Sequence, residues 1–212
     1  MKAALLMSIL VVGAPAIASA AEGKVVRLFV RHDVSDYGTW RKAYDGFAES
    51  QRKGGVVAQA VYRSEISPGD ITVVHDFKTA EAARAFAASP DLKSTMEKSG
   101  VVGAPSLWFT TGEDAPIAEA RGVRLFVRHT VSDHAVWRKA YDGFADGQRK
   151  GGVIAKTVSR SIDDPNDVTV VHDFKDLKTA QAFAASADLK AAMEKAGVVG
   201  APQIWFTARA AK

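Results

Sequence analysis

Residues 26–34 alternate between two kinds of side chain, which is the pattern of a β-strand. Leu28 and His32 fall on one face of this strand, whereas Phe29 and Arg31 fall on the other. The first face is otherwise apolar, so we expect it to cover a hydrophobic core. The segment therefore predicts a strand that carries a histidine on its core-facing side.

Residues 36–53 follow the period of a helix instead. Their largest side chains recur at i, i+4, i+7 and i+11, which places them along one helix face. Ser35 or Asp36 is suited to cap the beginning of this helix, and two glycines at 54–55 end it. Packing against a sheet is the simplest role for the face, which consists of Trp40, Tyr44, Phe47 and Gln51.

The rest of the first half completes one unit. Strands are predicted at 56–63, 71–77 and 105–110, and helices at 80–88 and 89–100. The element order is then β-α-β-β-α-α-β. This is the order of the split βαβ, or ferredoxin-like, unit, an antiparallel four-stranded sheet with its helices on one face.

The second half of the chain repeats the first. Val26–His32 recurs as Val123–His129, an offset of 123 − 26 = 97 residues, and Trp40–Ala48 recurs as Trp137–Ala145. About two-thirds of the aligned positions are identical, which indicates a tandem duplication. Two copies of a unit of this size form a pair of domains rather than a solenoid.

A single unit would leave one sheet face, with Phe29 and Trp108, open to water. The second copy can cover that face with its own. We therefore predict an α+β protein in which two tandem ferredoxin-like units pack sheet to sheet as an intramolecular pseudo-dimer. Arg31 and Arg128 would lie at this seam and pair with acidic residues on neighbouring strands, Asp76 and Asp173.

The first twenty residues differ from the rest. Lys2 precedes an apolar run at 3–12 that is too short to span a bilayer, and small residues at 18–20 form a cleavage site. We expect a signal peptide that directs the chain to the periplasm or out of the cell; a buried N-terminal helix is the alternative. The expected domains are a signal peptide at 1–20, a first repeat at 21–111, a linker at 112–122 and a second repeat at 123–212.

Composition limits the partners. The 212 residues include 28 Lys and Arg against 24 Asp and Glu, a net charge of +4, and no cysteine. The basic residues are interleaved with acidic ones, so we expect no nucleic acid partner and no membrane anchor after signal removal. Without cysteine, disulfides and a lipid-modified cysteine are excluded. No motif for a phosphate loop or a catalytic triad occurs, and no cofactor is predicted.

Several motifs that occur in both repeats together resemble a known family. They are a strand ending in His-x-Val-x-Asp, a helix with Trp-x-x-x-Tyr, a strand with Val-x-His-Asp-Phe, and a closing Gly-Val-x-Gly-x-Pro. The set resembles the dimeric α/β-barrel superfamily and, within it, the antibiotic biosynthesis monooxygenase-like proteins. This resemblance implies an α/β barrel made within one chain. It also implies an activity drawn from cofactor-independent quinol monooxygenases, haem-degrading enzymes, polyketide cyclases or proteins with no known reaction.

Two positions depart from that family's pattern. Phe86-Ala87-Ala88 stands where a histidine often lies on the second helix, and His75-Asp76-Phe77 replaces Glu-x-Trp on the third strand. Both departures argue against oxidative and haem chemistry in this chain.

Four of the five histidines form repeated pairs, His32 with His129 and His75 with His172. The two histidines of one unit are expected more than ~10 Å apart along adjacent strands, and no acid or thiol completes a set of ligands, so no metal site is predicted. His32 and His129 are candidate catalytic bases or ligand partners; a core-edge histidine bonded to backbone is the alternative. The ligand-binding candidates are Trp40, Tyr44, His75, Trp137, Tyr141 and His172.

Three functions remain open. The first is an exported protein that binds a small apolar or aromatic molecule between helices and sheet, in one or both repeats. The second is a cofactor-independent monooxygenase or cyclase-like enzyme, with His32 and His129 as bases. The third is a structural or interaction role, which predicts no pocket large enough for a ligand. In each case the pseudo-dimer is expected to be monomeric or weakly self-associating.

Overall fold

The structure, a computed structural model, describes residues 25–112 and 122–210. The expected signal peptide at 1–20 lies outside the described residues, as does the interior of the expected linker. Within the described ranges, no helix is both long and apolar enough to cross a bilayer.

Each repeat folds into four strands and four short helices. The first repeat comprises β1 (Val26–Val34), α1 (Tyr37–Gly46), α2 (Ala48–Lys53), β2 (Val56–Ser64), β3 (Asp70–Phe77), α3 (Ala80–Ala87), α4 (Pro90–Lys98) and β4 (Val101–Gly112). The second comprises β5 (Val123–Val131), α5 (His134–Gly143), α6 (Ala145–Lys150), β6 (Ala155–Ser161), β7 (Asp167–Phe174), α7 (Leu177–Ala184), α8 (Ala187–Lys195) and β8 (Val198–Arg209).

The helix predicted at 36–53 is in fact two helices that meet at Phe47. Asp36 caps the first, since its carboxylate accepts a hydrogen bond from the Thr39 backbone N–H at 2.7 Å. The Phe47 N–H is shared between the carbonyls of Ala43 and Tyr44, at 3.1 and 3.2 Å. This tighter hydrogen bonding interrupts the α-helical pattern for one residue and separates α1 from α2.

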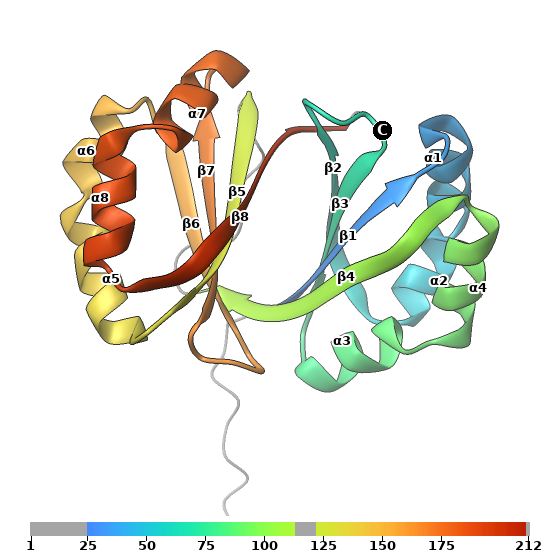
Figure 1. The fold of residues 1–212 in the computed structure, drawn as a ribbon. Helices are drawn as coiled ribbons and strands as arrows, with labels where there is room; N and C mark the ends of the chain where they lie inside the picture. The colour runs from blue at the N-terminus through green and yellow to red at the C-terminus, as the bar shows by residue number, and fades with distance from the viewer. Residues whose placement is uncertain (1–24, 113–121, 211–212) are drawn as a thin grey trace, which may run out of the picture.

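β4 begins at Val101, earlier than the predicted Pro105, because Val101 and Val102 pair with the end of β1 beyond a bulge. At its other end β4 extends past its own repeat, and Thr110–Gly112 pair with β6, while the end of β8 pairs with β2 in the same way. In Figure 1, β4 and β8 cross the middle of the molecule in opposite senses.

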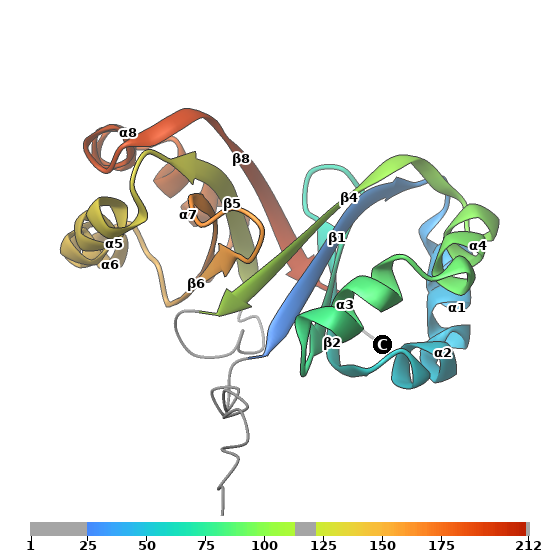
Figure 2. The same ribbon diagram turned by 90° about the horizontal axis from the view of Figure 1, so that it is seen from below.

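The described strands form one closed barrel in the order β1-β3-β2-β8-β5-β7-β6-β4. The predicted α+β fold, with two ferredoxin-like units forming an intramolecular α/β barrel, is confirmed. The two sheets do not only face each other, because their edges also hydrogen-bond at the β2–β8 and β4–β6 seams. Figures 1 and 2 show the helices of each repeat outside the strands, on opposite sides of the molecule.

The alternation predicted in β1 is also confirmed. Leu28 belongs to an outer core between helices and sheet, whereas Phe29 belongs to a core inside the barrel. The second repeat has its own outer core, so the protein has three apolar clusters in the described residues. The interior cluster is shared by both repeats and consists of Phe29, Tyr62, Val74, Trp108, Phe126, Val171 and Trp205.

The predicted ion pairs of Arg31 and Arg128 are wrong. Arg31 bonds to Asp70, at 2.7 and 3.0 Å, and Arg128 bonds to Asp167 in the same way. In the β1–β3 register Arg31 lies opposite Thr72, so its diagonal neighbour is Asp70 and not Asp76.

Asp76 and Asp173 instead lie opposite Arg27 and Arg124, the arginines four residues earlier on β1 and β5. Arg27 makes a two-pronged pair with Asp76, and Arg124 makes the same pair with Asp173, each at 2.7 and 2.9 Å. These pairs fill the barrel interior with charge as well as with aromatic rings.

Candidate functional site

Each repeat encloses a cavity between its helices and the outer face of its sheet. The first pocket, in the first repeat, has a volume of about 30 Å³, and the second pocket, in the second repeat, about 40 Å³. Five of the equivalent positions that line both pockets carry a histidine, tryptophan, tyrosine or glutamine. These are His32, Trp40, Tyr44, Gln51 and His75 in the first, and His129, Trp137, Tyr141, Gln148 and His172 in the second.

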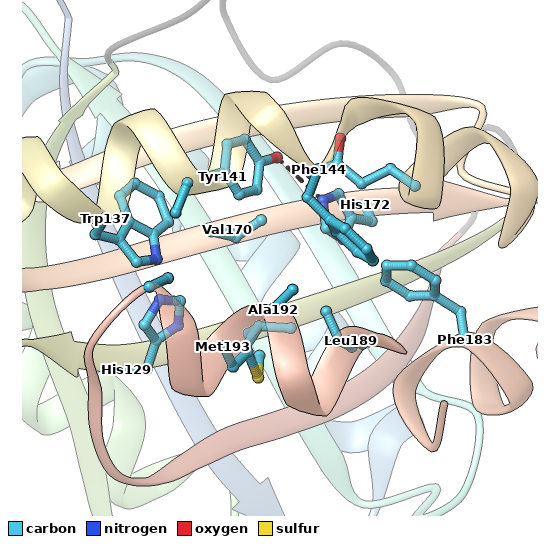
Figure 3. A pocket seen from close by; sticks show the side chains of 14 residues that line it. His129, Trp137, Tyr141, Phe144, Val170, His172, Phe183, Leu189, Ala192 and Met193 are labelled. Atoms are coloured by element: carbon cyan, nitrogen blue, oxygen red, sulfur yellow. Dashed lines mark hydrogen bonds between the residues drawn. The ribbon is translucent and has the colours of Figure 1, made fainter. Parts of the chain in front are cut away.

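Figure 3 shows how the second pocket is built. Tyr141 extends from α5 toward His172 on β7, and Trp137, one turn earlier on α5, lies over His129. Met193 and its neighbours on α8 form the opposite wall. The i, i+4 spacing on the helix and the alternation of the strands bring these side chains together.

The aromatic rings form a continuous stack. In the first pocket the rings of Trp40 and Tyr44 lie 5.1 Å apart at 20°, and those of Tyr44 and His75 lie 6.0 Å apart at 11°. The second pocket has the same arrangement, with 5.1 Å at 22° and 6.0 Å at 3°. Such a row of flat faces is a surface on which another ring can pack.

A tyrosine and a histidine are hydrogen-bonded at one end of each stack. Tyr44 Oη and His75 Nε2 are 3.1 Å apart, and Tyr141 Oη and His172 Nε2 are 3.0 Å apart. Burial raises the pKa of Tyr44 well above its ordinary value, and lowers the pKa of His75 to about 4 and that of His172 to about 3. Tyr44, His75 and His172 are therefore neutral near pH 7.

The other end of each pocket is formed by His32 or His129. Only 6% of His32 and 7% of His129 is exposed, and neither ring nitrogen of either residue has a hydrogen-bond partner in the protein. The alternative expectation, a core histidine bonded to backbone, is therefore wrong. Burial lowers the pKa of both histidines to about 4, against the opposing attraction of nearby carboxylates such as Asp70 and Asp167. Each is a neutral group that offers one donor and one acceptor to the cavity.

Gln51 is a site residue that the sequence analysis did not select. It lies on the predicted apolar stripe, is 2% exposed, and lines the first pocket. It is close enough to Tyr44 to oppose slightly the rise of that pKa, yet both atoms of its amide group lack a hydrogen-bond partner. The signal that could have found it is an amide at a core-facing helix position in both repeats.

His32 and His75 lie at different heights along the sheet. His32 is opposite Ile71 in the β1–β3 register, four residues from His75, or about 13 Å at the usual strand rise. Both nonetheless line the same pocket, one at each end. In the described ranges, no group of three or more His, Cys, Asp or Glu side chains could hold a metal ion.

Several solved structures are similar to this fold. An anthrone oxidase-like protein has a TM-score of 0.62 at 13% identity, over 90% of this chain and 93% of its own. A ferredoxin-fold protein related to antibiotic biosynthesis monooxygenases, from Listeria monocytogenes, has a TM-score of 0.52 at 6% identity, over 90% and 97%. A monooxygenase-like protein from Listeria innocua has 0.52 at 8% identity, over 88% and 94%.

The chain has the antibiotic biosynthesis monooxygenase-like fold. The similarity extends over both repeats, so the duplicated unit as a whole matches these structures. No protein-family model and no curated protein matches the sequence. At these identities the similarity establishes the fold, and the chemistry has to be argued from the pockets.

The size of the pockets constrains what this fold can hold here. A cavity that accepts benzene in another protein measures ~150 Å³, several times the volume of either pocket. Each pocket does hold more than the ~15 Å³ that one water needs. A ring can therefore enter only when part of the lining moves, and Met96 and Met193 are the flexible lining side chains.

Proposed function

We propose that this protein binds a small aromatic molecule in the pocket of each repeat, without transforming it. The proposal rests on His32 and His129, which are buried and line the two cavities, and whose ring nitrogens lack any protein partner. A buried polar group left unsatisfied costs ~1–3 kcal/mol. A purely structural core would be more stable with an apolar residue at both positions, so these histidines favour a ligand.

The shape and chemistry of the lining support a flat ligand. The stack that begins at Trp40 and ends at His75 offers ring faces, while Leu92 and Met96 of α4 supply an apolar cover. A ligand with one aromatic ring and a polar atom directed at His32 matches these groups. Its size is limited to about one ring, because the pocket has to expand to admit it.

A thermal-unfolding screen with single-ring aromatic compounds tests this proposal. A compound that binds the folded state at a hundred times its Kd stabilises that state by ~2.7 kcal/mol and raises the Tm. The double variant His32→Phe with His129→Phe should fold and lose the shift. Lys190→Gln, an exposed lysine on α8, is the matched control and should keep it. A panel in which no compound raises the Tm of the unsubstituted protein overturns the proposal and leaves a structural role.

The second candidate function is a cofactor-independent monooxygenase or cyclase-like enzyme. It is supported by the fold, which is shared with proteins described as monooxygenase-like and anthrone oxidase-like. His32 would then remove a proton from a hydroxyl-bearing ring. A base whose pKa is about 4 is poorly matched to that task near pH 7, which is why binding is the first proposal. Oxygen uptake with quinol or anthrone substrates, abolished by His32→Ala with His129→Ala, would favour the enzyme over the binding protein.

We also propose that the protein acts after export, on the basis of the pattern at residues 1–20. N-terminal sequencing of the protein from the periplasm or medium is expected to begin at Ala21. A mature chain that retains Met1 and Lys2 in the cytoplasm would contradict export while leaving the binding proposal intact.

A further inference from the structure

The two pockets share their histidines and aromatic rings but differ around one glutamine. In the first pocket both amide atoms of Gln51 are buried and have no partner. In the second, the equivalent Gln148 accepts a hydrogen bond of 2.7 Å from Lys156 Nζ. Because both glutamines are 2% exposed, solvent access does not account for the difference.

The cause is a substitution on the neighbouring strand. Gln59 of β2 stands where Lys156 stands on β6, 97 residues later. Gln59 accepts a hydrogen bond of 2.8 Å from the Tyr44 hydroxyl and makes none to Gln51. The Lys156 ammonium lies 4.9 Å from the centre of the Tyr141 ring and reaches Gln148 beyond it. Lys156 therefore hydrogen-bonds the amide of Gln148 in the second pocket, whereas no group in the described part of the chain hydrogen-bonds the amide of Gln51 in the first.

The wall near the last helix of each repeat is also more polar in the first pocket than in the second. Thr95 and Ser99 line the first pocket, and Ala192 and Ala196 take their places in the second. The wall formed by α8 in the second pocket therefore lacks the two hydroxyl groups that α4 and the residue after it bring to the first.

We propose that the two pockets select different ligands: the first takes an aromatic ring that carries a neutral group able to donate and accept hydrogen bonds, such as a carboxamide, and the second takes an aromatic ring without such a group beside Gln148. This inference rests on the proposed function. A free carboxamide side chain offers two N–H donors and a carbonyl acceptor, so its natural complement is another group of the same kind. A ligand that leaves the Gln51 amide unpaired in the first pocket loses affinity. In the second pocket the carbonyl oxygen of Gln148 already accepts a hydrogen bond from Lys156.

Two methionines allow each pocket to be observed separately. The chain has four methionines, of which Met1 and Met7 lie in the N-terminal segment, while Met96 lines the first pocket and Met193 the second. In the full chain labelled with ¹³C at the methionine methyl groups, Met96→Leu and Met193→Leu assign the two pocket signals. The probes are benzamide, a ring with a carboxamide, and toluene, an apolar ring of similar size.

Benzamide is expected to shift the Met96 signal at a concentration about fivefold to tenfold lower than that needed for Met193, which is the effect of one neutral hydrogen bond. Toluene is expected to favour Met193. Lys156→Gln should free Gln148 and bring benzamide binding at Met193 toward that at Met96, and Gln59→Lys should weaken it at Met96. Lys190→Gln is the control and should change neither.

The outcomes distinguish failure of aromatic-ring binding from failure of the inferred selectivity. If neither probe shifts either methyl signal, the proposed binding of aromatic rings fails. If both probes shift both signals at equal concentrations, and Lys156→Gln has no effect, rings bind but the inferred selectivity is wrong. A reversed preference, with benzamide stronger at Met193, also overturns the inference.

Discussion

Arg124 donates a hydrogen bond of 2.6 Å to the hydroxyl of Tyr62, which belongs to the other repeat. The Tyr62 ring also meets Phe126 edge-on at 5.5 Å inside the barrel. At the opposite seam Ser159 replaces this tyrosine, and Ser159 Oγ and Arg27 Nη1 are both buried without a partner. The two seams of the barrel are therefore unequal, and the one containing Tyr62 is the better satisfied.

Tyr62→Ser is expected to destabilise the protein by ~3 kcal/mol, because a buried ring and a hydrogen bond are lost together. Tyr62→Phe keeps the ring and should cost only ~1 kcal/mol. Urea unfolding measures both differences. If the two variants lose the same free energy, the ring does not contribute and the argument about unequal seams fails.

The two buried ion pairs, Arg124–Asp173 and Arg27–Asp76, are also expected to contribute unequally to stability. The side chains of Arg124 and Asp173 are each 2% exposed, whereas Asp76, the partner of Arg27, is 16% exposed. Removing one partner of a buried pair leaves an uncompensated charge and costs ~3–5 kcal/mol. Asp173→Asn should therefore lower the free energy of unfolding more than Asp76→Asn, and equal losses from the two variants would contradict this ranking.

The stability of the fold is expected to decrease in mild acid. Burial lowers the pKa of His32, His75 and His129 from 6.5 to about 4, and that of His172 to about 3. Between pH 6.5 and 4 the unfolded chain therefore binds protons that the folded chain does not, so stability rises with pH in this window. The total loss on acidification is limited to roughly 3 kcal/mol per histidine. Urea unfolding from pH 8 to 4 measures it, and a flat profile above pH 4.5 would show that the histidines are not buried as described.

Replacing the unpartnered histidines should strengthen the fold while removing function. His32→Phe with His129→Phe removes four buried nitrogens without partners and keeps a ring beside Trp40 and Trp137. We expect a gain of ~1–3 kcal/mol per site at pH 7 and a larger gain at pH 5. Loss of stability in this double variant at both pH values would mean that the histidines serve the structure after all.

Much of the architecture could be predicted because it depends on local periods. The alternation in β1 correctly separates Leu28 from Phe29, and the offset of 97 residues implies a second, equivalent unit. The division of the helix at Phe47 could not be predicted, because it arises from a shared hydrogen bond in a sequence that still has helical spacing. The barrel is implied by the family resemblance and not by the local periods, since its closure depends on how far β4 and β8 extend past their own repeats.

The candidate site shows a similar limit. The sequence predicts His32, Trp40, Tyr44 and His75 as candidate site residues, and the structure brings all four to one pocket. Contacts between particular pairs of residues are harder to predict from the sequence. Arg31 pairs with Asp70 because Asp70 is its diagonal neighbour on β3, which depends on the strand register. The contrast between Gln51 and Gln148 depends on a side chain from another strand, Lys156, and no pattern within a single helix carries that information.

Native mass spectrometry of the protein isolated from the cells that produce it would detect a ligand that the pockets hold. We predict one or two small aromatic molecules per chain, present under native conditions and absent after denaturation. The double variant His32→Phe with His129→Phe should show the bare chain under both conditions. A bare chain for the unsubstituted protein, even after incubation with saturating single-ring aromatics, would contradict the proposal that the pockets are binding sites.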